Sequence, residues 1–520
     1  MTVTQYMLAH PGHILAGAGA SFVAFLIIVR ILTEIRVRRC GGVRAPIIAS
    51  NPFTSLPLFI RIARAQLNHH LLETFEAFFH GAPASSPHCV EVCWMGYRRF
   101  IMTDEPAQIK TVLTSKFADF GKGPDFHRMW EPFLGDSIFT TDGKAWQDNR
   151  SLIRPMFVKD RVKDLANFGK WTDVLLSKLP APGVTVDIMD LFYRMTLDVT
   201  TEFLLGTSVN SLDNSKHHFA QAFNDVQRIQ TFYTIMAPFE TFMPRGEFHK
   251  AMAVIKQFIA PYIEQVLALP REDLDKLSHP EKGFTFLHAI ARSTRDKKLI
   301  QDQLIAVLLA GRDTTAATLS WTFYELSRQP AVVKKIRTEI LTTIGAKKAP
   351  SYEDLKNMPY ITHCINETLR LYPAVPFNLR QALTDTTLPG QPGQPDISVL
   401  KGDVIAYSTL SMQRRKDLYP PSGPDLASPA VYSPERWERW SPRPWHYVPF
   451  NGGPRICVGQ NFAMTEMAYT LVKVFQRYDR LEYRGDWSAQ FMKAEIVGTP
   501  GQGVTVALFE PEELPPKTAF

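Results

Sequence analysis

The chain has 520 residues, of which 45% are hydrophobic, and it carries a formal net charge of +7. This length allows two or three average domains or one large fold around a cofactor, and the lack of an internal repeat after residue 60 favours a single catalytic domain. The positive charge is spread along the chain, which argues against a nucleic-acid-binding protein. The five cysteines are odd in number and widely spaced, which argues against a disulfide framework and for a reducing compartment.

The N-terminal segment predicts a membrane anchor. No charged side chain precedes Arg30, and residues 13–32 are mostly apolar, a run that spans about 30 Å as a helix and matches the hydrocarbon core of a bilayer. Against the single acid Glu34, the flank carries five arginines: Arg30, Arg36, Arg38, Arg39 and Arg44. This excess predicts a cytosolic flank, with residues 1–12 in the lumen. A cleaved secretory signal is the competing interpretation, weakened by the absence of a basic segment before the apolar run and of a cleavage site after it.

The remaining sequence predicts a mostly helical protein. Residues 33–60 are expected to form a basic linker containing proline and glycine, and residues 61–520 a folded domain. Alternation over Val90–Met102 predicts a hairpin that turns at Met95-Gly96. Helices are expected at Pro106–Ser115, Gly143–Leu152, Arg161–Leu179, Leu191–Leu205, His217–Phe232, Glu247–Leu269, Leu299–Arg328, Ala331–Ile344, Ile361–Leu371 and Asn461–Arg477. Extended or irregular structure is expected at Val404–Tyr407, residues 420–449, Ile496 and Val504–Phe509. The expected fold class is mainly α with a small, segregated β part.

Cys457 stands in a glycine-rich, cationic loop, in the run from Phe450 to Gly459 (Phe-Asn-Gly-Gly-Pro-Arg-Ile-Cys-Val-Gly). A predicted helix follows, and the positive end of its dipole favours a thiolate at Cys457. Arg455 adds positive charge and a planar group that can grip a carboxylate. Gly453 and Gly459 permit backbone conformations that other residues resist. These are the requirements of a thiolate that binds a haem with carboxylate tails.

A second unusual run, Ala310-Gly311-Arg312-Asp313-Thr314-Thr315, lies in the middle of the longest predicted helix. Glycine, aspartate and threonine are poor helix-interior residues, so a local function must outweigh their intrinsic cost. Gly311 would let a flat cofactor or a diatomic ligand approach the backbone. Thr314 can bond back to an upstream carbonyl and bend the helix, and Asp313 with Thr314 can relay protons.

Both runs resemble motifs of the cytochrome P450 family: the haem-binding pattern Phe-x-x-Gly-x-Arg-x-Cys-x-Gly and the oxygen-activation pattern Ala/Gly-Gly-x-Asp/Glu-Thr-Thr. The resemblance covers about residues 50–510. It implies a haem b with Cys457 as the only protein ligand to iron, and proton transfer to iron-bound dioxygen by Asp313 and Thr314. The loop residues Phe450, Gly453, Arg455 and Gly459, together with Ala310 and Gly311, would contact the haem.

Two further family features are matched. A buried glutamate–arginine–arginine cluster supports the cysteine loop in the family, and here it corresponds to Glu367, Arg370 and Arg436. Trp437 follows where the family usually has phenylalanine or another aromatic residue. The groups that would hold the haem propionates are Trp146, Arg150, Arg380 and Arg455. A neighbouring branch has a glutamate in place of Ala310 that links covalently to haem, so no such ester is expected here.

Three segments, Phe133–Phe139, Pro376–Arg380 and Tyr447–Arg455, resemble the fungal, membrane-bound branch that hydroxylates n-alkanes and fatty acids. The implied function is oxidation of a long, apolar substrate at or near its terminal carbon, with dioxygen and with electrons from NADPH delivered by a reductase, cytochrome b5 being a further candidate partner. The implied location is the endoplasmic reticulum membrane, with one span and a cytosolic catalytic domain. Candidate residues of a substrate channel are Phe126, Phe139, Phe232, Val307, Val375, Phe377 and Val497.

Three alternatives remain at this stage. The same chemistry could act on a secondary metabolite, a sterol or an aromatic compound. A haem isomerase would need no reductase, and retention of Asp313 and Thr314 argues against it. A non-catalytic haem carrier or gas sensor would not need that proton relay.

Overall fold

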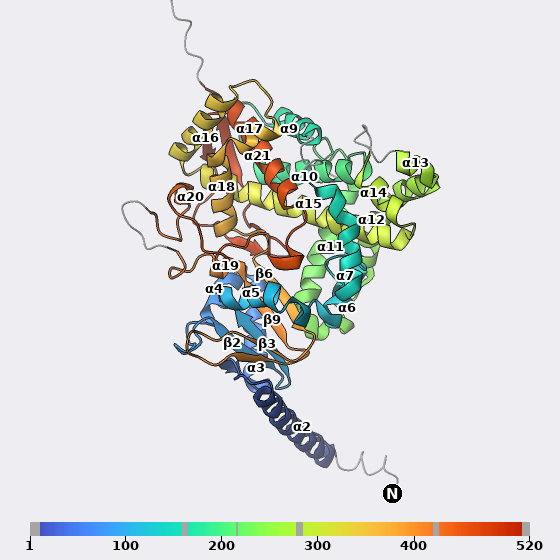
Figure 1. The fold of residues 1–520 in the computed structure, drawn as a ribbon, viewed down its shortest axis with the longest axis vertical. Helices are drawn as coiled ribbons and strands as arrows, with labels where there is room; N and C mark the ends of the chain where they lie inside the picture. The colour runs from blue at the N-terminus through green and yellow to red at the C-terminus, as the bar shows by residue number, and fades with distance from the viewer. Residues whose placement is uncertain (1–10, 159–164, 215–216, 277–283, 420–425, 512–520) are drawn as a thin grey trace, which may run out of the picture. The chain divides into compact units, whose positions relative to one another are not determined.

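The computed structural model describes residues 11–158, 165–214, 217–276, 284–419 and 426–511. The chain forms two compact units. Unit 1 comprises residues 1–123 and 378–408, and unit 2 comprises residues 124–377 and 409–520. Figure 1 shows that helices dominate the fold and that strands are confined to small sheets, in agreement with the expected fold class.

Unit 1 is built on a six-stranded sheet in the order β1-β2-β3-β9-β6-β4. Its strands are β1 (Ile47–Ala49), β2 (Cys89–Trp94), β3 (Arg98–Thr103), β9 (Val404–Ser408), β6 (Phe377–Ala382) and β4 (Phe120–Gly121). The expected hairpin is present: β2 pairs antiparallel with β3, and positive φ angles at Met95 (49°) and Gly96 (85°) turn the chain. A small second sheet joins β7 (Thr386–Leu388) to β8 (Ile397–Val399). The helical segments are α2 (Pro11–Arg39), α3 (Pro52–Leu67), α4 (Leu71–Ala77), α5 (Pro106–Lys110) and the π-helical turn Thr111–Ser115.

The segment expected as a linker, residues 33–60, carries regular structure. Helix α2 continues to Arg39, β1 joins the edge of the sheet, and α3 begins at Pro52. Asn51 caps α3, because its side chain accepts the backbone N–H of Thr54 at 3.1 Å. Within α2, residues 16–39 are long and apolar enough to cross a membrane. The expected span at 13–32 therefore lies in a helix that extends seven residues further into unit 1.

Unit 2 is helical. Its helices are α6 (Gly123–Leu134), α7 (Gly143–Ile153), α9 (Ala166–Lys178), α10 (Ile188–Leu205), α11 (His218–Ile235), α12 (Gly246–Ala268), α13 (Arg271–Lys276), α14 (Phe286–Ser293), α15 (Lys297–Leu326), α16 (Pro330–Thr343), α17 (Tyr352–Lys356), α18 (Pro359–Leu371), α19 (Thr409–Met412), α20 (Arg436–Arg439) and α21 (Gln460–Arg477). Its strands are β5 (Thr185–Asp187), β10 (Arg480–Tyr483), β11 (Met492–Ala494), β12 (Gly498–Pro500) and β13 (Thr505–Phe509).

Helix α15 forms the centre of unit 2. Twenty-three of its 30 residues are buried, which explains why the sequence shows no clear polar face there. One hydrophobic cluster joins the C-terminal part of α15 to α18 and α21, and a second joins its N-terminal part to α11, α12 and α14. The central helix thus connects two cores, and its unusual residues Ala310–Thr315 lie between them.

Candidate active site

The loop that carries Cys457 is closed by the backbone. The Cys457 N–H donates to the carbonyl of Phe450 at 2.9 Å. Gly453 adopts a φ of +65°, which favours glycine, and opens a short 3-10 turn. A Cβ on Gly452 would come within 2.5 Å of the Trp445 ring, so that position has no room for a side chain. The sequence therefore prescribes a tight loop that ends directly before helix α21.

Cys457 differs from the other cysteines in its surroundings. Its side chain is accessible, whereas Cys89, Cys93 and Cys364 are buried and Cys40 is half-buried. Although it is accessible, Cys457 lies deep among protein atoms. This desolvation raises the pKa of the thiol, while the backbone N–H of Gly459 and the charge of Arg150 lower it. A cation and an amide donor beside an accessible sulfur suit a thiolate that binds a metal.

Two expected propionate ligands lie beside this loop. Arg150 on α7 donates from Nη2 to the carbonyl of Ile456 at 2.8 Å, one residue before Cys457. The guanidinium of Arg455 lies 4.6 Å from the centre of the Trp146 ring and donates to Asp142 at 2.6 Å. Trp146, Arg150, Arg455 and Cys457 are thus brought together by α7 and the cysteine loop. Asp142 was missed in the sequence, because a single aspartate before a helix reads as an ordinary N-cap.

Arg380, the remaining predicted propionate ligand, belongs to unit 1. It is buried on β6 and donates from Nη1 to the Asn378 side chain at 2.8 Å. Asn378 also accepts the Lys122 ammonium at 3.1 Å. Two cations therefore share one amide oxygen, a local excess of positive charge that suits an anionic partner.

The polar residues of α15 have separate surroundings. The Thr314 hydroxyl donates to the Ala310 carbonyl at 2.7 Å, the back-bond expected from the sequence. The Asp313 carboxylate is buried and lies 3.2 Å from the Arg312 guanidinium. Burial raises the pKa of Asp313 to about 6, although Arg312 opposes the shift. Asp313 is therefore a buried acid whose pKa lies well above its ordinary value, a property that marks a candidate functional group.

The packing of α15 explains why a glycine stands at position 311, and the sequence did not suggest this explanation. A Cβ at this position would lie 2.9 Å from Thr200 Oγ1 and 3.1 Å from Thr200 Cγ2. Thr200 is on α10, whose packing on α15 therefore depends on the missing side chain. The sequence interpretation assigned the space at Gly311 to a ligand, and the structure shows that the Cβ direction points at a neighbouring helix.

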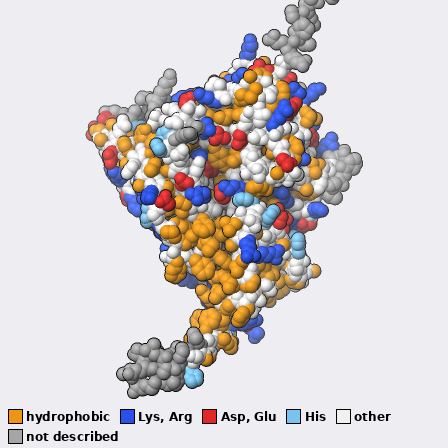
Figure 2. All heavy atoms as spheres, turned by 180° about the vertical axis from the view of Figure 1, so that it is seen from behind, with side chains coloured by type: hydrophobic (Ala, Val, Ile, Leu, Met, Phe, Trp, Pro, Cys, Tyr) orange, Lys and Arg blue, Asp and Glu red, His pale blue; other side chains and the backbone are white. Residues whose placement is uncertain are grey.

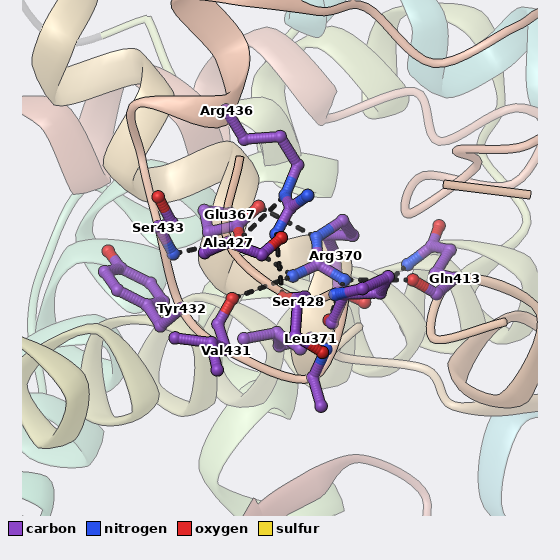
Figure 3. Close-up of polar contacts among 12 residues, drawn as sticks. Glu367, Arg370, Leu371, Gln413, Ala427, Ser428, Val431, Tyr432, Ser433 and Arg436 are labelled. Atoms are coloured by element: carbon purple, nitrogen blue, oxygen red, sulfur yellow. Dashed lines mark hydrogen bonds and ion pairs between the residues drawn. The ribbon is translucent and has the colours of Figure 1, made fainter. Parts of the chain in front are cut away.

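The cluster of Glu367, Arg370 and Arg436 is fully buried, with side-chain exposures of 0%. Figure 3 shows the two guanidinium groups converging on one carboxylate. Arg370 donates to Glu367 through Nε at 2.8 Å and Nη2 at 2.7 Å, and Arg436 Nε lies 3.4 Å from the same carboxylate. Glu367 also accepts the Trp437 indole N–H at 3.0 Å and the Ser433 backbone N–H at 3.1 Å. A carboxylate with this many donors is held rigidly.

The arginines of this cluster bind the backbone of the irregular segment that precedes the cysteine loop. Arg370 donates to the carbonyl of Pro429 at 2.7 Å, and Arg436 donates to that of Ser428 at 3.0 Å. Gln413, which sequence reasoning missed, donates to the carbonyls of Leu369 and Arg370 and accepts the Val448 N–H at 2.9 Å. It therefore connects the end of α18 to the chain two residues before Phe450. No sequence pattern marked Gln413, because an isolated glutamine has no distinctive spacing.

The candidate channel residues fall into separate groups. Phe126, Phe139 and Val307 belong to the core around the N-terminal half of α15. Val497 packs with Ala374 and with Ala317, which follows Thr314 by three residues on α15. Phe377 is half-buried, while Phe232 and Val375 are 43% and 38% exposed. Val497 is thus a candidate from outside α15 that packs on this helix two residues after Thr315.

Comparisons with known proteins agree with these motifs. The family model described as Cytochrome P450 matches residues 53–503. The chain is 43% identical to the cytochrome P450 monooxygenase pvhE of Talaromyces variabilis, with 96% of each chain covered. It is 40% identical to cytochrome P450 52A1 of Candida tropicalis, covering 74% of this chain and 73% of that protein. A crystal structure of the cytochrome P450DA heme domain superposes with a TM-score of 0.72 at 19% identity, covering 90% of this chain and 97% of that one. The chain therefore belongs to the cytochrome P450 family and is a haem-thiolate monooxygenase that uses dioxygen and reductase-supplied electrons from NADPH.

Proposed function

We propose that the protein is a membrane-anchored hydroxylase of long, unbranched aliphatic chains, fatty acids or n-alkanes, which it oxidises at or near the terminal carbon. The observation that supports the catalytic assignment most directly is the accessible Cys457 sulfur, with Arg150 and the Gly459 N–H beside it. This donor set fits an iron-bound thiolate. Haem supplies the activation of dioxygen, and a thiolate ligand favours cleavage of the O–O bond.

The remaining roles follow from chemistry within unit 2. Trp146, Arg150 and Arg455 form a cationic and aromatic group that suits the carboxylates of haem. Thr314 Oγ1 carries a proton that it can donate, and Asp313, with a pKa of about 6, is the proposed proton source next to it in the sequence. Glu367, Arg370 and Arg436 fix the segment that leads into the cysteine loop. Arg380 stays a proposed propionate ligand because its position matches the family pattern.

Two measurements test this assignment. Cys457→His should abolish the long-wavelength band of the reduced, CO-bound protein that reports a thiolate ligand, and survival of the band would exclude Cys457. Thr314→Ala should keep reductant consumption but release more peroxide per product. Thr318→Ala, which removes the same back-bonded hydroxyl one turn later on α15, is the matched control and should stay coupled.

The substrate class is supported by the resemblance of Phe133–Phe139 and Pro376–Arg380 to fungal alkane and fatty-acid hydroxylases. Each methylene group of the substrate that is buried contributes about 0.8 kcal/mol to the binding free energy, so longer chains bind more tightly. Oxidation at the terminal carbon also requires a channel that admits only the end of the chain. Val497→Ala should therefore shift the products of a saturated fatty acid inward. Val474→Ala, which truncates the same residue type at a buried position on α21, controls for general loosening.

A second candidate substrate class is a secondary metabolite. The similarity to the pvhE monooxygenase is higher and covers more of the chain than the similarity to cytochrome P450 52A1, and the name of pvhE states no substrate, so this class stays open beside the aliphatic one. Turnover of a polycyclic or aromatic compound, together with no turnover of fatty acids or n-alkanes, would favour this class.

The proposed location is the endoplasmic reticulum membrane, with α2 as a single span and unit 2 in the cytosol beside the reductase, and with cytochrome b5 as a further electron donor. Support comes from the apolar stretch of residues 16–39 and from the three arginines in the last turn of α2. Protease treatment of sealed microsomes should digest both units and protect only the N-terminal end. Protection of the catalytic domain would reverse the proposed orientation.

A further inference from the structure

The loop between α6 and α7, residues 135–142, is held at both of its ends. Its first residues contact the beginning of α15, and its last residues contact the cysteine loop. All three segments belong to unit 2. The loop therefore links the central helix to the cysteine loop by a route that does not pass through residues 310–315.

Charged pairs alone would not distinguish this loop. Figure 2 shows acidic and basic side chains intermingled over much of the surface in view, and exposed pairs contribute little to stability. Asp302 on α15 differs because it is 5% exposed, whereas the side chains of Lys298 and Asp136 beside it are 56% and 49% exposed. A buried carboxylate requires hydrogen-bond donors, so the donors around Asp302 show what it holds in place.

Asp302 holds the first residues of the loop. Its Oδ2 accepts the backbone N–H of Asp136 at 2.9 Å and the Lys298 ammonium at 2.9 Å. Gly135 has a φ of +54°, and a Cβ at this position would lie 1.9 Å from Asp302 Cγ. The carboxylate therefore occupies the space that a side chain at position 135 would need, which explains why a glycine stands there.

Two amide side chains fix the same point of the loop. The carbonyl of Asp136 accepts Gln303 Nε2 at 3.2 Å and Asn149 Nδ2 at 2.8 Å. Gln303 lies on α15 and Asn149 on α7, and both are buried. Both backbone polar groups of Asp136 are thus bonded to buried side chains, a network that makes the start of the loop rigid.

Hydrogen bonds inside the loop extend this order towards its end. The Thr140 hydroxyl donates to the carbonyl of Gly135 at 2.6 Å, and the Thr141 hydroxyl donates to that of Ser137 at 2.7 Å. The Ser137 N–H in turn donates to Thr140 Oγ1 at 3.1 Å. Ser137, Thr140 and Thr141 are buried, so water does not compete for these bonds.

The end of the loop receives the guanidinium of Arg455. Nη1 donates to the carbonyl of Ile138 at 3.3 Å, and Nη2 donates to the carbonyl of Thr141 at 2.9 Å and to Asp142 Oδ1 at 2.6 Å. A planar guanidinium with several fixed acceptors is held in one orientation. The orientation of Arg455 therefore depends on the loop, and the start of the loop depends on Asp302.

We propose that Asp302 is a positioning residue of the haem site, which acts through residues 135–142 on the orientation of Arg455. Asp302 precedes Thr314 by twelve residues, about 18 Å along α15, so it does not act by contact with the catalytic stretch of this helix. This inference rests on the proposed role of Arg455 as a ligand of the haem carboxylates.

Two substitutions that remove the same charge separate position from charge. Asp302→Ala removes the acceptor of the Asp136 N–H, whereas Asp302→Asn keeps an oxygen there. Asp136→Asn is the control, because Asp136 contacts Asp302, Gln303 and Asn149 through its backbone, which the substitution retains.

A further variant loosens the loop without changing any charge. Gln303→Leu removes one of the two donors to the Asp136 carbonyl, and Gln303 Oε1 makes no hydrogen bond with the described residues that would be lost. This variant tests the inference independently of how well the alanine variant folds. The reduced, CO-bound spectrum and thermal unfolding check that each protein is intact.

The first measurement is the transfer of haem from the full-length holoenzyme to excess apomyoglobin. Asp302→Ala should release haem about tenfold faster than Asp302→Asn, the change expected when a hydrogen bond to a charged group is lost. Asp136→Asn should release haem at the native rate. Gln303→Leu should change the rate in the same direction as Asp302→Ala, by a smaller factor, because Asn149 still holds the Asp136 carbonyl.

The second measurement is the reduction potential of the iron. It should be lower in Asp302→Ala than in Asp302→Asn, because a guanidinium that is held less firmly neutralises the haem carboxylates less and favours the ferric state. Loss of the Asp302 charge alone would raise the potential equally in both variants. A merely structural role would lower the unfolding temperature and leave the two potentials equal, and this result would overturn the inference.

Arg455→Lys separates the inference from the role of Arg455 itself. This variant should release haem faster than the native protein, and adding Asp302→Ala should change nothing further, because the planar group that the loop orients is already gone. Fast release from Arg455→Lys with a native rate for Asp302→Ala would overturn the inference and leave the role of Arg455 standing. A native rate for Arg455→Lys would overturn that role, and the inference with it.

Discussion

Asp313 is a buried acid whose titration affects the stability of the folded protein. Its folded-state pKa of about 6 lies above the ordinary value of 3.8, so the folded protein binds the proton more tightly than the unfolded chain. The penalty for burying the charge is therefore present above about pH 6 and is relieved as the pH falls towards 4. Its upper size is about 3 kcal/mol, from about two pKa units.

Asp313→Asn removes that penalty and also the titrating proton. The variant should gain stability over the native protein, and this gain should be larger at pH 7.5 than at pH 4.5. Its turnover should be slower than that of the native protein at every pH. Thermal unfolding across this pH range, with haem content as a check, measures the first effect. A stability difference that does not change with pH would show that Asp313 titrates in the ordinary range.

Glu367→Gln tests the buried cluster. The substitution keeps the shape of the side chain but leaves the two fully buried arginines without a counter-charge, which costs about 3–5 kcal/mol. We expect a large loss of haem per protein. The matched control is Glu247→Gln, since Glu247 pairs with Lys250 at the same spacing but at exposures of 79% and 76%. That change should stay within about 0.5 kcal/mol. Fully haem-loaded Glu367→Gln protein would argue against the proposed support of the loop.

At the scale of single residues, the charged members of the cluster could be predicted from the sequence. Glu367 and Arg370 share a helix face, and Arg436 stands in a family motif. It could not show that Gln413 or Trp437 completes the network. Their contacts depend on the path of an irregular segment, which leaves no periodic pattern.

At the scale of elements, the close approach of α10 and α15 depends on Gly311. Gly311→Ala should destabilise the protein by about 1–3 kcal/mol, because the new methyl group meets the Thr200 side chain at 2.9 Å. Thr200→Ala removes both contacting atoms, and its buried hydroxyl makes no hydrogen bond that would be lost. The double variant should recover most of the loss in thermal unfolding. Thr201→Ala on the same helix is the control and should give no rescue. Equal loss in the single and double variants would exclude this contact as the cause.

The sequence predicted helices correctly where apolar residues recur regularly over several turns. It missed short helices and two helices that contain proline. Helices α7, α10, α11, α12, α15, α16, α18 and α21 begin and end within three residues of their predicted bounds. The predicted start of α9, Arg161, lies outside the described residues. Among the helices that were missed, α3 and α6 contain proline, and α4, α13, α14, α17, α19 and α20 have at most eight residues. Ile496 lies in a bend before β12 rather than in extended structure.

At the scale of the whole molecule, the wrong expectation of a linker at residues 33–60 has a physical explanation. Glycine and proline usually interrupt regular structure, but here Gly42 permits a close backbone approach, and Pro52 occupies the first position of α3. The fold class was predictable, because long apolar periods dominate the sequence. The attachment of the N-terminal segment was not, since its contacts involve Asp385, Asp396 and Ser398, more than 340 residues away.

The last prediction compares two truncations. Among the side chains that the structure describes, removing residues 2–25 deletes only exposed ones of α2. Removing residues 2–44 also deletes Val37, Gly42 and Arg44, and Arg44 is an ion-pair partner of Glu91, a carboxylate with 0% exposure. Hydrogen bonds from Arg99 and Arg44 hold the pKa of Glu91 below its ordinary value despite its burial, so losing one cation weakens a charge that water cannot reach.

The shorter truncation should therefore keep the thermal stability of the full-length protein, whereas the longer one should unfold at a lower temperature, because about 1 kcal/mol shifts the midpoint by about 1 °C in a chain of this length. Glu91→Gln in the longer truncation should return part of that loss, since it removes the charge that Arg44 would compensate. The same substitution in the full-length protein should destabilise, because there it leaves Arg99 and Arg44 with less negative charge. Equal unfolding temperatures for the two truncations would show that residues 26–44 serve only as a tether. A difference rescued by Glu91→Gln would show that the end of α2 is part of the folded unit, because the ion pair between Arg44 and Glu91 would then account for the lost stability.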